Sequence, residues 1–329
     1  MLKAAQATGR IRYLSIAVSA AMLMSCTAVK ESYAPQDPAK TIVVNDEVVL
    51  IASTERPMPV KIFYPEAGGP YPLIVLSHGT FSNRHRYDRI AEFWAGQGYV
   101  VMLPQHIDAD YGVKPSSYDV MQDVVRTRAA DMSLVLDELE DIKSAVPDLA
   151  GKIASDAYVA AGHSIGTQVS MLVTGGHFRT AFNGEEMSAP ETRYRALILV
   201  SDPGKMRLMP RDMWVASAVP TFMATGTDDF GLMGSRGEST EAQTEILSMG
   251  IEPDALRYEL LLEGGDHYFG GLVQKEVDAE PDYEGLAIFN ATSTAFLDAV
   301  MKDDPLARAY LDTVNLQEAT EGRAMLTKP

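Results

Sequence analysis

The stretch from Ala157 to Gly166, which reads AYVAAGHSIG, limits the fold of this chain more than any other part of it. Its apolar, β-prone run Tyr158–Ala161 predicts a buried strand, and the apolar spacing over Thr167–Thr174 is compatible with a helix. Between the two lies the pattern G-x-S-x-G, with Ser164 at its centre. A turn this tight would hold the serine in a strained backbone conformation and would need glycine on both sides. We therefore predict a nucleophile elbow; the alternative is a chance Gly/Ser turn.

The rest of the chain alternates apolar runs with amphipathic segments, which predicts an α/β fold with a mainly parallel central sheet and helices on both faces. Leu73–Ser77 is typical of a strand buried on both faces, and an antiparallel pair, Thr41–Ser53 and Met58–Tyr64, precedes it. Further strands are expected at Tyr99–Leu103, Ala196–Val200, Pro220–Ala224 and Leu256–Leu262, and helices at Tyr87–Gln97, Asp119–Ile142 and Gly285–Met301.

Two segments are expected to lie over the carboxyl edge of this sheet, where sites form in parallel α/β folds. One is Gly175–Arg195, as a small cap-like insert, and the other is the Met-rich segment Met206–Trp214. The second could line an apolar acyl pocket, although ordinary core packing explains it about as well.

The first 25 residues have the features of a signal peptide, because a basic leader precedes the short apolar run Leu14–Met24. The sequence Leu23–Cys26 resembles a bacterial lipobox, so we expect Cys26 to be lipidated. The protein would then be exported and anchored to a membrane on the periplasmic side of a bacterial cell envelope. The alternative is an ordinary signal peptide cleaved nearby, which would give a periplasmic or secreted protein.

We expect residues 26–40 to form a tether, residues 41–302 a catalytic domain and residues 303–329 a C-terminal helical tail. Cys26 is the only cysteine, so the chain forms no intramolecular disulfide. The formal net charge of −17 argues against nucleic acid as a partner, because a phosphate backbone needs a basic surface.

A serine hydroxyl needs a positioned base, and His267 is the candidate among six histidines. It follows the last expected strand and has glycines on both sides, so its loop can fold back over the edge of the sheet. His163 is next to the serine and should point away from the hydroxyl. His78 lies beside an expected donor loop and is interpreted as structural.

The acid that orients His267 should follow the strand before it. Asp229 is preferred there, with its neighbour Asp228 as the alternative, and Asp202 and Asp266 are more distant possibilities.

The oxyanion of a tetrahedral intermediate needs two donors. We expect the backbone amide of Ile165 from the elbow and that of Thr80 from the loop after Leu73–Ser77, with Phe81 as the alternative to Thr80.

Taken together, Gly-His-Ser-Ile-Gly, His78-Gly79-Thr80, Gly226-Thr227-Asp228-Asp229 and Gly265-Asp266-His267 resemble the α/β-hydrolase superfamily. Leu73–Gln105 and Asp131–Leu139 are similar to bacterial dienelactone-hydrolase-like, platelet-activating-factor acetylhydrolase-like and polyester-hydrolase-like esterases. The likeness spans about residues 58–301 and implies hydrolysis of a small-molecule or lipid ester by the triad Ser164, Asp229 and His267, with no metal or cofactor. The donor loop lacks the glycine run of some lipases, and Ser164 replaces the cysteine nucleophile of true dienelactone hydrolases.

Four other functions remain open. A peptidase or a lipase-like acylhydrolase could use the same triad. A metal-dependent hydrolase could use His106, Asp108 and Asp110, with His85, because imidazole and carboxylate at this spacing could hold a divalent ion. A non-catalytic binding lipoprotein could use the same scaffold.

Overall fold

The computed structural model describes residues 33–34, 38–39, 41–53, 55–112, 118–179, 186–201, 219–229 and 256–328. The expected signal peptide, Cys26, most of the tether, Asp202 and the segment Met206–Trp214 lie outside the described residues.

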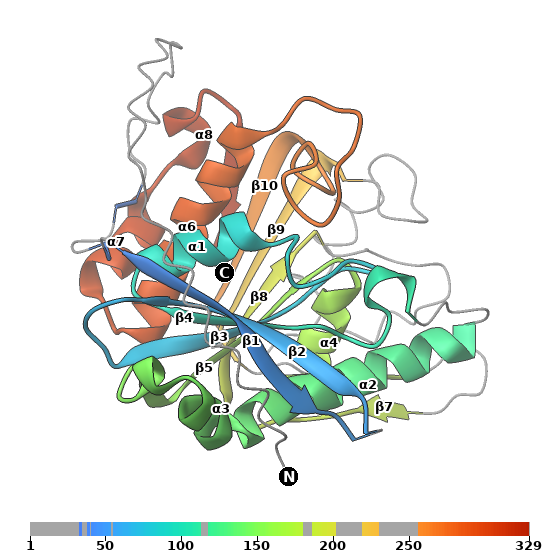
Figure 1. The fold of residues 1–329 in the computed structure, drawn as a ribbon. Coiled ribbons are helices and arrows are strands. Elements are labelled where there is room, and N and C mark those ends of the chain that lie inside the picture. Colours follow the sequence, from blue (N-terminus) through green and yellow to red (C-terminus); the bar gives the residue numbers. More distant parts are fainter. Residues whose placement is uncertain are drawn as a thin grey trace.

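The described residues form a nine-stranded sheet in the order β1-β2-β4-β3-β5-β8-β9-β10-β11 (Figure 1). Neighbouring strands from β4 to β10 run parallel, and antiparallel pairing is confined to β1, β2 and β11 at the two sides of the sheet. The strands are β1 Ile42–Ile51, β2 Pro57–Pro65, β3 Tyr71–Ser77, β4 Val100–Pro104, β5 Ile153–His163, β8 Tyr194–Val200, β9 Thr221–Asp228, β10 Arg257–Asp266 and β11 Ala324–Thr327.

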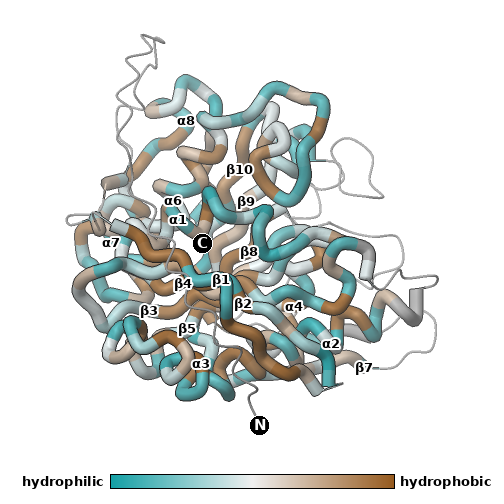
Figure 2. Tube along the Cα trace, viewed as in Figure 1, coloured by the Kyte–Doolittle hydropathy of each residue, from teal (hydrophilic) through white to brown (hydrophobic). Residues whose placement is uncertain are grey.

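Helices cover both faces of the sheet, as expected (Figure 1). They are α1 Asp88–Gly96, α2 Tyr118–Asp137, α3 Leu139–Ala145, α4 Ile165–Val173, α6 Tyr283–Met301, α7 Pro305–Thr313 and α8 Leu316–Ala319, with 3₁₀ turns at Ala109–Tyr111 and Pro147–Leu149. α1, α6 and α7 contribute to one buried cluster and α2, α3 and α4 to the other. Figure 2 shows hydrophobic residues along the strands between these layers and hydrophilic residues on the outer turns of the helices.

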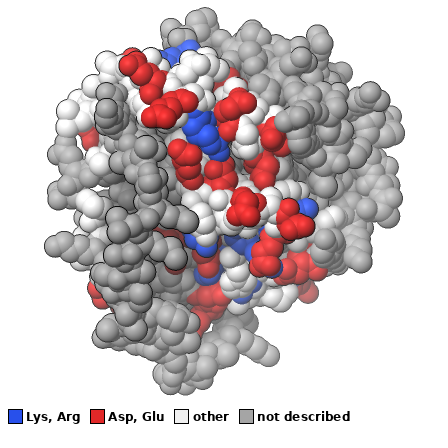
Figure 3. Space-filling model, turned by 90° about the horizontal axis from the view of Figure 1, so that it is seen from above, with Lys and Arg blue, Asp and Glu red and all other residues white. Residues whose placement is uncertain are grey.

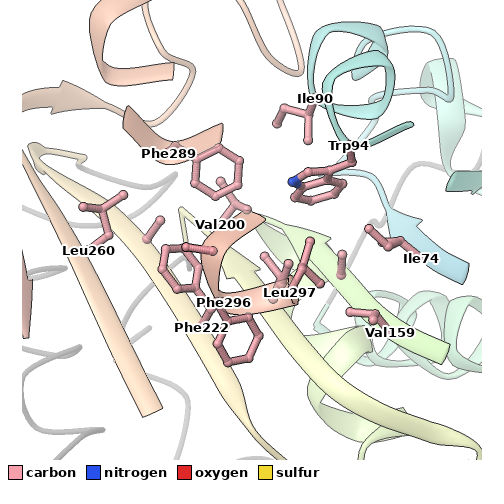
Figure 4. Packing of buried hydrophobic residues seen from close by; sticks show 14 of the residues in the cluster. Ile74, Ile90, Trp94, Val159, Val200, Phe222, Leu260, Phe289, Phe296 and Leu297 are labelled. Carbon is pink, nitrogen blue, oxygen red and sulfur yellow. The ribbon is translucent and has the colours of Figure 1, made fainter. Parts of the chain in front are cut away.

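Aromatic rings fill much of the core on the α1 and α6 face. Phe289 and Phe296 of α6 lie against Phe222 of β9, with ring centroids 6.3 and 5.7 Å apart, and Trp94 of α1 packs on Phe289 at 6.1 Å (Figure 4). These side chains are fully buried, and burial of large rings contributes about 1.5–3 kcal/mol each relative to exposure. This packing holds α1 and α6 against one face of the sheet.

The structure differs from the sequence-based prediction at the expected helix Asp119–Ile142. It is divided into α2 and α3 at Glu138, whose ψ of 16° departs from helical geometry. Four acidic residues crowd this point, Asp137, Glu138, Glu140 and Asp141, and like charges three or four positions apart weaken a continuous helix.

Two further differences concern short strands. Residues 303–329, expected to be a helical tail, contain α7 and α8 but then add β11 to the sheet, antiparallel to β10. Within the described part of the insert, two short strands, β6 His177–Arg179 and β7 Glu186–Ser188, pair antiparallel near the C-terminal end of α4, where Met187 is buried. Within the described ranges, no helix combines the length and hydropathy that crossing a membrane requires.

Candidate active site

Ser164 lies in a sharp turn between β5 and α4, with φ 55° and ψ −126°. Its amide donates to the carbonyl of Val200 on β8 at 3.0 Å, which holds the turn against the sheet. The two glycines of the motif are required by crowding. A Cβ on Gly162 would collide with the backbone of Gly166, and a Cβ on Gly166 would collide with the backbone of Ser77. The strand, strained serine and helix expected from the sequence are therefore present.

Ser164 is not the only strained residue near the ends of these strands. Phe81, Ser201, Phe269 and Gln274 also have positive φ, between 50° and 66°. Left-handed backbone is costly for residues other than glycine and tends to gather where a site demands a particular geometry.

His267 and Asp229 lie side by side although 38 residues separate them in the chain. His267 Nδ1 is 2.7 Å from Asp229 Oδ1, and Thr225 Oγ1 donates to the other carboxylate oxygen at 3.0 Å. Both partners are buried, with Asp229 fully inaccessible. Burial alone would raise the pKa of Asp229, but the hydrogen bonds from His267 and Thr225 hold it below its usual value. An ionised carboxylate only accepts, so Nδ1 carries the hydrogen and Nε2 is left as an acceptor.

His267 Nε2 is buried and has no hydrogen-bond partner among the described residues. The imidazole lies beside the elbow, because its ring centroid is 5.0 Å from that of His163, the neighbour of Ser164. No hydrogen bond joins Ser164 Oγ to Nε2 within the described part of the chain. Catalytic hydrogen bonds are often long before substrate binds and tighten in the complex.

The other carboxylates weighed from the sequence are placed differently. Asp228 is the last residue of β9 and is partly exposed, whereas Asp229 follows the strand and turns inward. Asp266 accepts from the amides of Tyr268 at 2.6 Å and Gly270 at 3.0 Å, so it closes the turn that carries His267.

The backbone amides of Ile165, Thr80 and Phe81, which were considered as oxyanion donors, differ in their hydrogen bonds. Ile165 is the first residue of α4, so its amide has no carbonyl in the preceding turn to bind. The Thr80 amide forms no hydrogen bond with another described residue, whereas the Phe81 amide donates to Asp108 Oδ2 at 3.2 Å. The geometry thus favours Thr80 over Phe81 as the second donor.

A buried arginine, not singled out from the sequence, supports the loop that carries Thr80. Arg128 of α2 is fully buried and binds both oxygens of Asp108, at 2.8 and 2.6 Å. It also donates to the carbonyls of His78 and Gly79. Burial would raise the pKa of Asp108, but Arg128 holds it below its usual value. The one sequence signal for this role is a charged residue, Arg128, among the apolar residues Val125, Ala129 and Met132 of the expected helix.

The side chains proposed for a metal-dependent alternative are already engaged. Asp108 is paired with Arg128, His106 lies between Asp131 and Ser77 at 2.9 Å from each, and Asp110 accepts from Asn83. His85 lies near Asp46 instead. Among the described residues, no three His, Cys, Asp or Glu side chains are grouped to hold a metal ion. The side chains of His85, His106, Asp108 and Asp110 therefore do not form the metal site considered from the sequence.

We expect His163 to make stability depend on pH. Burial, followed by the proximity of His267, lowers the pKa of His163 to about 3. The unfolded chain binds a proton there below about pH 6.5 and the folded chain does not, so the histidine costs stability as the pH falls. Replacing His163 with Gln should reduce the loss of unfolding free energy between pH 7 and pH 5 by about 2 kcal/mol, measured by urea denaturation. Equal losses in the two proteins would contradict this assignment.

The parallel sheet, the strained serine turn and the buried His–Asp pair at its edge define an α/β hydrolase. A family model described as Chlorophyllase matches residues 36–203, about half of the chain. The chain belongs to this family, which lies within the α/β-hydrolase superfamily of esterases. No protein among the curated ones matches the chain. The matched range contains Ser164 and Thr80 and ends before Asp229 and His267, and the narrower resemblance to dienelactone-hydrolase-like and acetylhydrolase-like esterases is not confirmed.

Proposed function

We propose that the protein hydrolyses carboxylic esters through an acyl-enzyme formed on Ser164. The observation that carries this proposal is the buried His267, which is held by Asp229 through Nδ1. Its Nε2, beside the strained serine turn, has no hydrogen-bond partner in the described part of the chain. A neutral imidazole in this tautomer can accept a proton from a serine hydroxyl.

In the proposed reaction, Ser164 Oγ attacks the ester carbonyl while its proton passes to His267 Nε2. The amides of Ile165 and Thr80 donate to the oxyanion that forms. As the carbonyl reforms, the bond to the alcohol breaks and the alcohol leaves with the proton from His267. Water then attacks the acyl-enzyme with His267 again as base, which releases the acid and restores Ser164. No metal or cofactor takes part in these steps.

Asp229 serves two purposes in this scheme. It fixes the tautomer of His267, and its negative charge stabilises the imidazolium that appears in each step. Because Thr225 and His267 occupy both carboxylate oxygens, the acid is held in one orientation before substrate binds.

We also propose that the mature protein is an exported lipoprotein anchored through Cys26, and that its partner is a small-molecule or lipid ester rather than nucleic acid. The lipobox-like sequence Leu23–Cys26 supports the anchor. The net charge of −17 supports the absence of nucleic acid binding, and Figure 3 shows Asp and Glu prevailing over Lys and Arg on the described surface seen from above.

A panel of substrates tests the reaction class. We expect turnover of p-nitrophenyl esters graded in acyl length, with little cleavage of an aminoacyl p-nitroanilide, measured by release of p-nitrophenol or p-nitroaniline. The name of the family makes chlorophyll a further ester to include. Preference for the anilide would indicate a peptidase. Absence of both turnover and fluorophosphonate labelling would indicate a binding protein on a hydrolase scaffold.

A further inference from the structure

His163 occupies the position before the nucleophile, and its ring binds two other segments of the site. Its Nε2 is 2.9 Å from the carbonyl oxygen of His267, and its Nδ1 is 3.1 Å from the hydroxyl of Tyr87. The same hydroxyl is 2.7 Å from the amide nitrogen of Gly79, next to Thr80. All four groups are buried, and Tyr87 and His163 are each only 1 % exposed.

These three contacts form a chain of hydrogen bonds. The direction of each bond follows from the groups at its two ends. The carbonyl of His267 can only accept, so His163 Nε2 carries the hydrogen. The neutral ring then has a lone pair at Nδ1, which accepts from the hydroxyl of Tyr87. The oxygen of that hydroxyl is left to accept from the amide of Gly79. Three bonds thus run in one direction, from the Thr80 loop through Tyr87 and His163 to the backbone of His267.

We infer that Tyr87 and His163 are positioning residues that fix the Thr80 loop, the serine turn and the His267 loop in place relative to one another. The inference rests on the proposed function, because it assigns these three segments the oxyanion donor, the nucleophile and the base. Each segment leaves a different strand, β3, β5 or β10, and β10 is separated from β5 by two strands. Slippage between them by more than about 0.5 Å would misalign the attack on the ester.

The neutrality of His163 is part of this arrangement. A proton at Nδ1 would face the hydroxyl hydrogen of Tyr87 and break the hydrogen bond between the two side chains. A charged ring would also lie 5.0 Å, centroid to centroid, from His267, which becomes an imidazolium during the reaction. Burial keeps His163 uncharged, so the position beside the nucleophile does not oppose the charge that develops on the base.

The first test removes one hydroxyl from the chain and compares it with a matched removal elsewhere. Tyr87→Phe deletes the central link, while Tyr194→Phe deletes a buried hydroxyl that donates to the carbonyl of Met132 at 3.0 Å, at the opposite end of the sheet. We expect Tyr87→Phe to lower kcat about tenfold to a hundredfold with KM within about threefold, because slippage acts mainly on the transition state. Tyr194→Phe should lower the melting temperature and leave kcat unchanged. Equal kcat values for the two variants would overturn the inference.

The second test asks whether hydrogen bonding by residue 163 is what matters. In His163→Gln an amide can still donate to His267 and accept from Tyr87, whereas His163→Leu can do neither. We expect His163→Gln to recover most of the kcat that His163→Leu loses. If both variants lose kcat to the same extent, the role of His163 is packing alone and the inference fails.

A third measurement needs no substrate, so it separates this inference from the proposed function. Nitrogen NMR of the labelled wild-type protein at pH 7 should show His163 with a protonated Nε2 and an unprotonated Nδ1. The low-field Nδ1–H resonance of His267 should shift in Tyr87→Phe and stay in place in Tyr194→Phe. A wild type inactive on every ester would refute the proposed function. A protonated Nδ1 on His163, or an unmoved His267 resonance in Tyr87→Phe, would refute the positioning chain.

Discussion

Replacing Ser164 with Ala is expected to lower the turnover of p-nitrophenyl butyrate by about 10⁶-fold, which is the scale seen when a serine hydrolase loses its nucleophile. The variant should also resist covalent labelling by a fluorophosphonate, measured by intact mass. The physical reason is that Ser164 supplies the hydroxyl at the strained turn beside the His267 ring, and alanine has none. Residual hydrolysis would come from the oxyanion donors and from substrate binding alone.

Ser170→Ala is the matched control for this experiment. Ser170 is a buried serine of α4, the helix that follows Ser164, and its hydroxyl has no hydrogen-bond partner among the described residues. Its replacement should leave both turnover and labelling unchanged. Retained labelling of Ser164→Ala, or loss of labelling in Ser170→Ala, would show that the nucleophile is assigned to the wrong residue.

Replacing Asp229 with Asn should lower kcat by about 10⁴-fold, while Asp228→Asn should stay close to wild type. An amide at position 229 has no charge to stabilise the imidazolium, and its NH₂ group can hold His267 in the wrong tautomer. Asp228 ends β9 with a partly exposed side chain, whereas the carboxylate of Asp229 is 2.7 Å from Nδ1 of His267.

Steady-state kinetics of the two variants, with melting temperatures to confirm folding, decide between the neighbouring carboxylates. A larger loss in Asp228→Asn would transfer the orienting role to that residue. Equal activity in both would place the acid elsewhere in the chain.

The parallel strands could be predicted from the sequence alone. Strands that are buried on both faces, such as those over Leu73–Ser77 and Ala196–Val200, are continuous runs of mostly apolar residues. Sequence order alone could not decide between Asp228 and Asp229. The choice depends on how the chain turns after β9, where the Asp229 amide donates back to the carbonyl of Gly226.

Other features depended on contacts between distant residues. Arg128 reads as one polar position in an amphipathic helix, and its role appears only when α2 is packed beneath the loop of Gly79. The strand β11 is four residues long, too short for an alternation pattern to identify it. Tyr87 lies at the start of a predicted helix, and nothing local to it indicates a partner 76 residues away in His163.

The left-handed residues around the site bear on how this protein could be engineered. Glycine at Phe81, whose side chain is only partly buried, would relieve backbone strain in the folded state, so a screen for heat resistance would be drawn to this position. The same exchange would add freedom to the loop that carries the Thr80 amide. Heat resistance and catalytic rate are therefore coupled through the backbone conformation beside the site, and selection for one alone would be expected to erode the other.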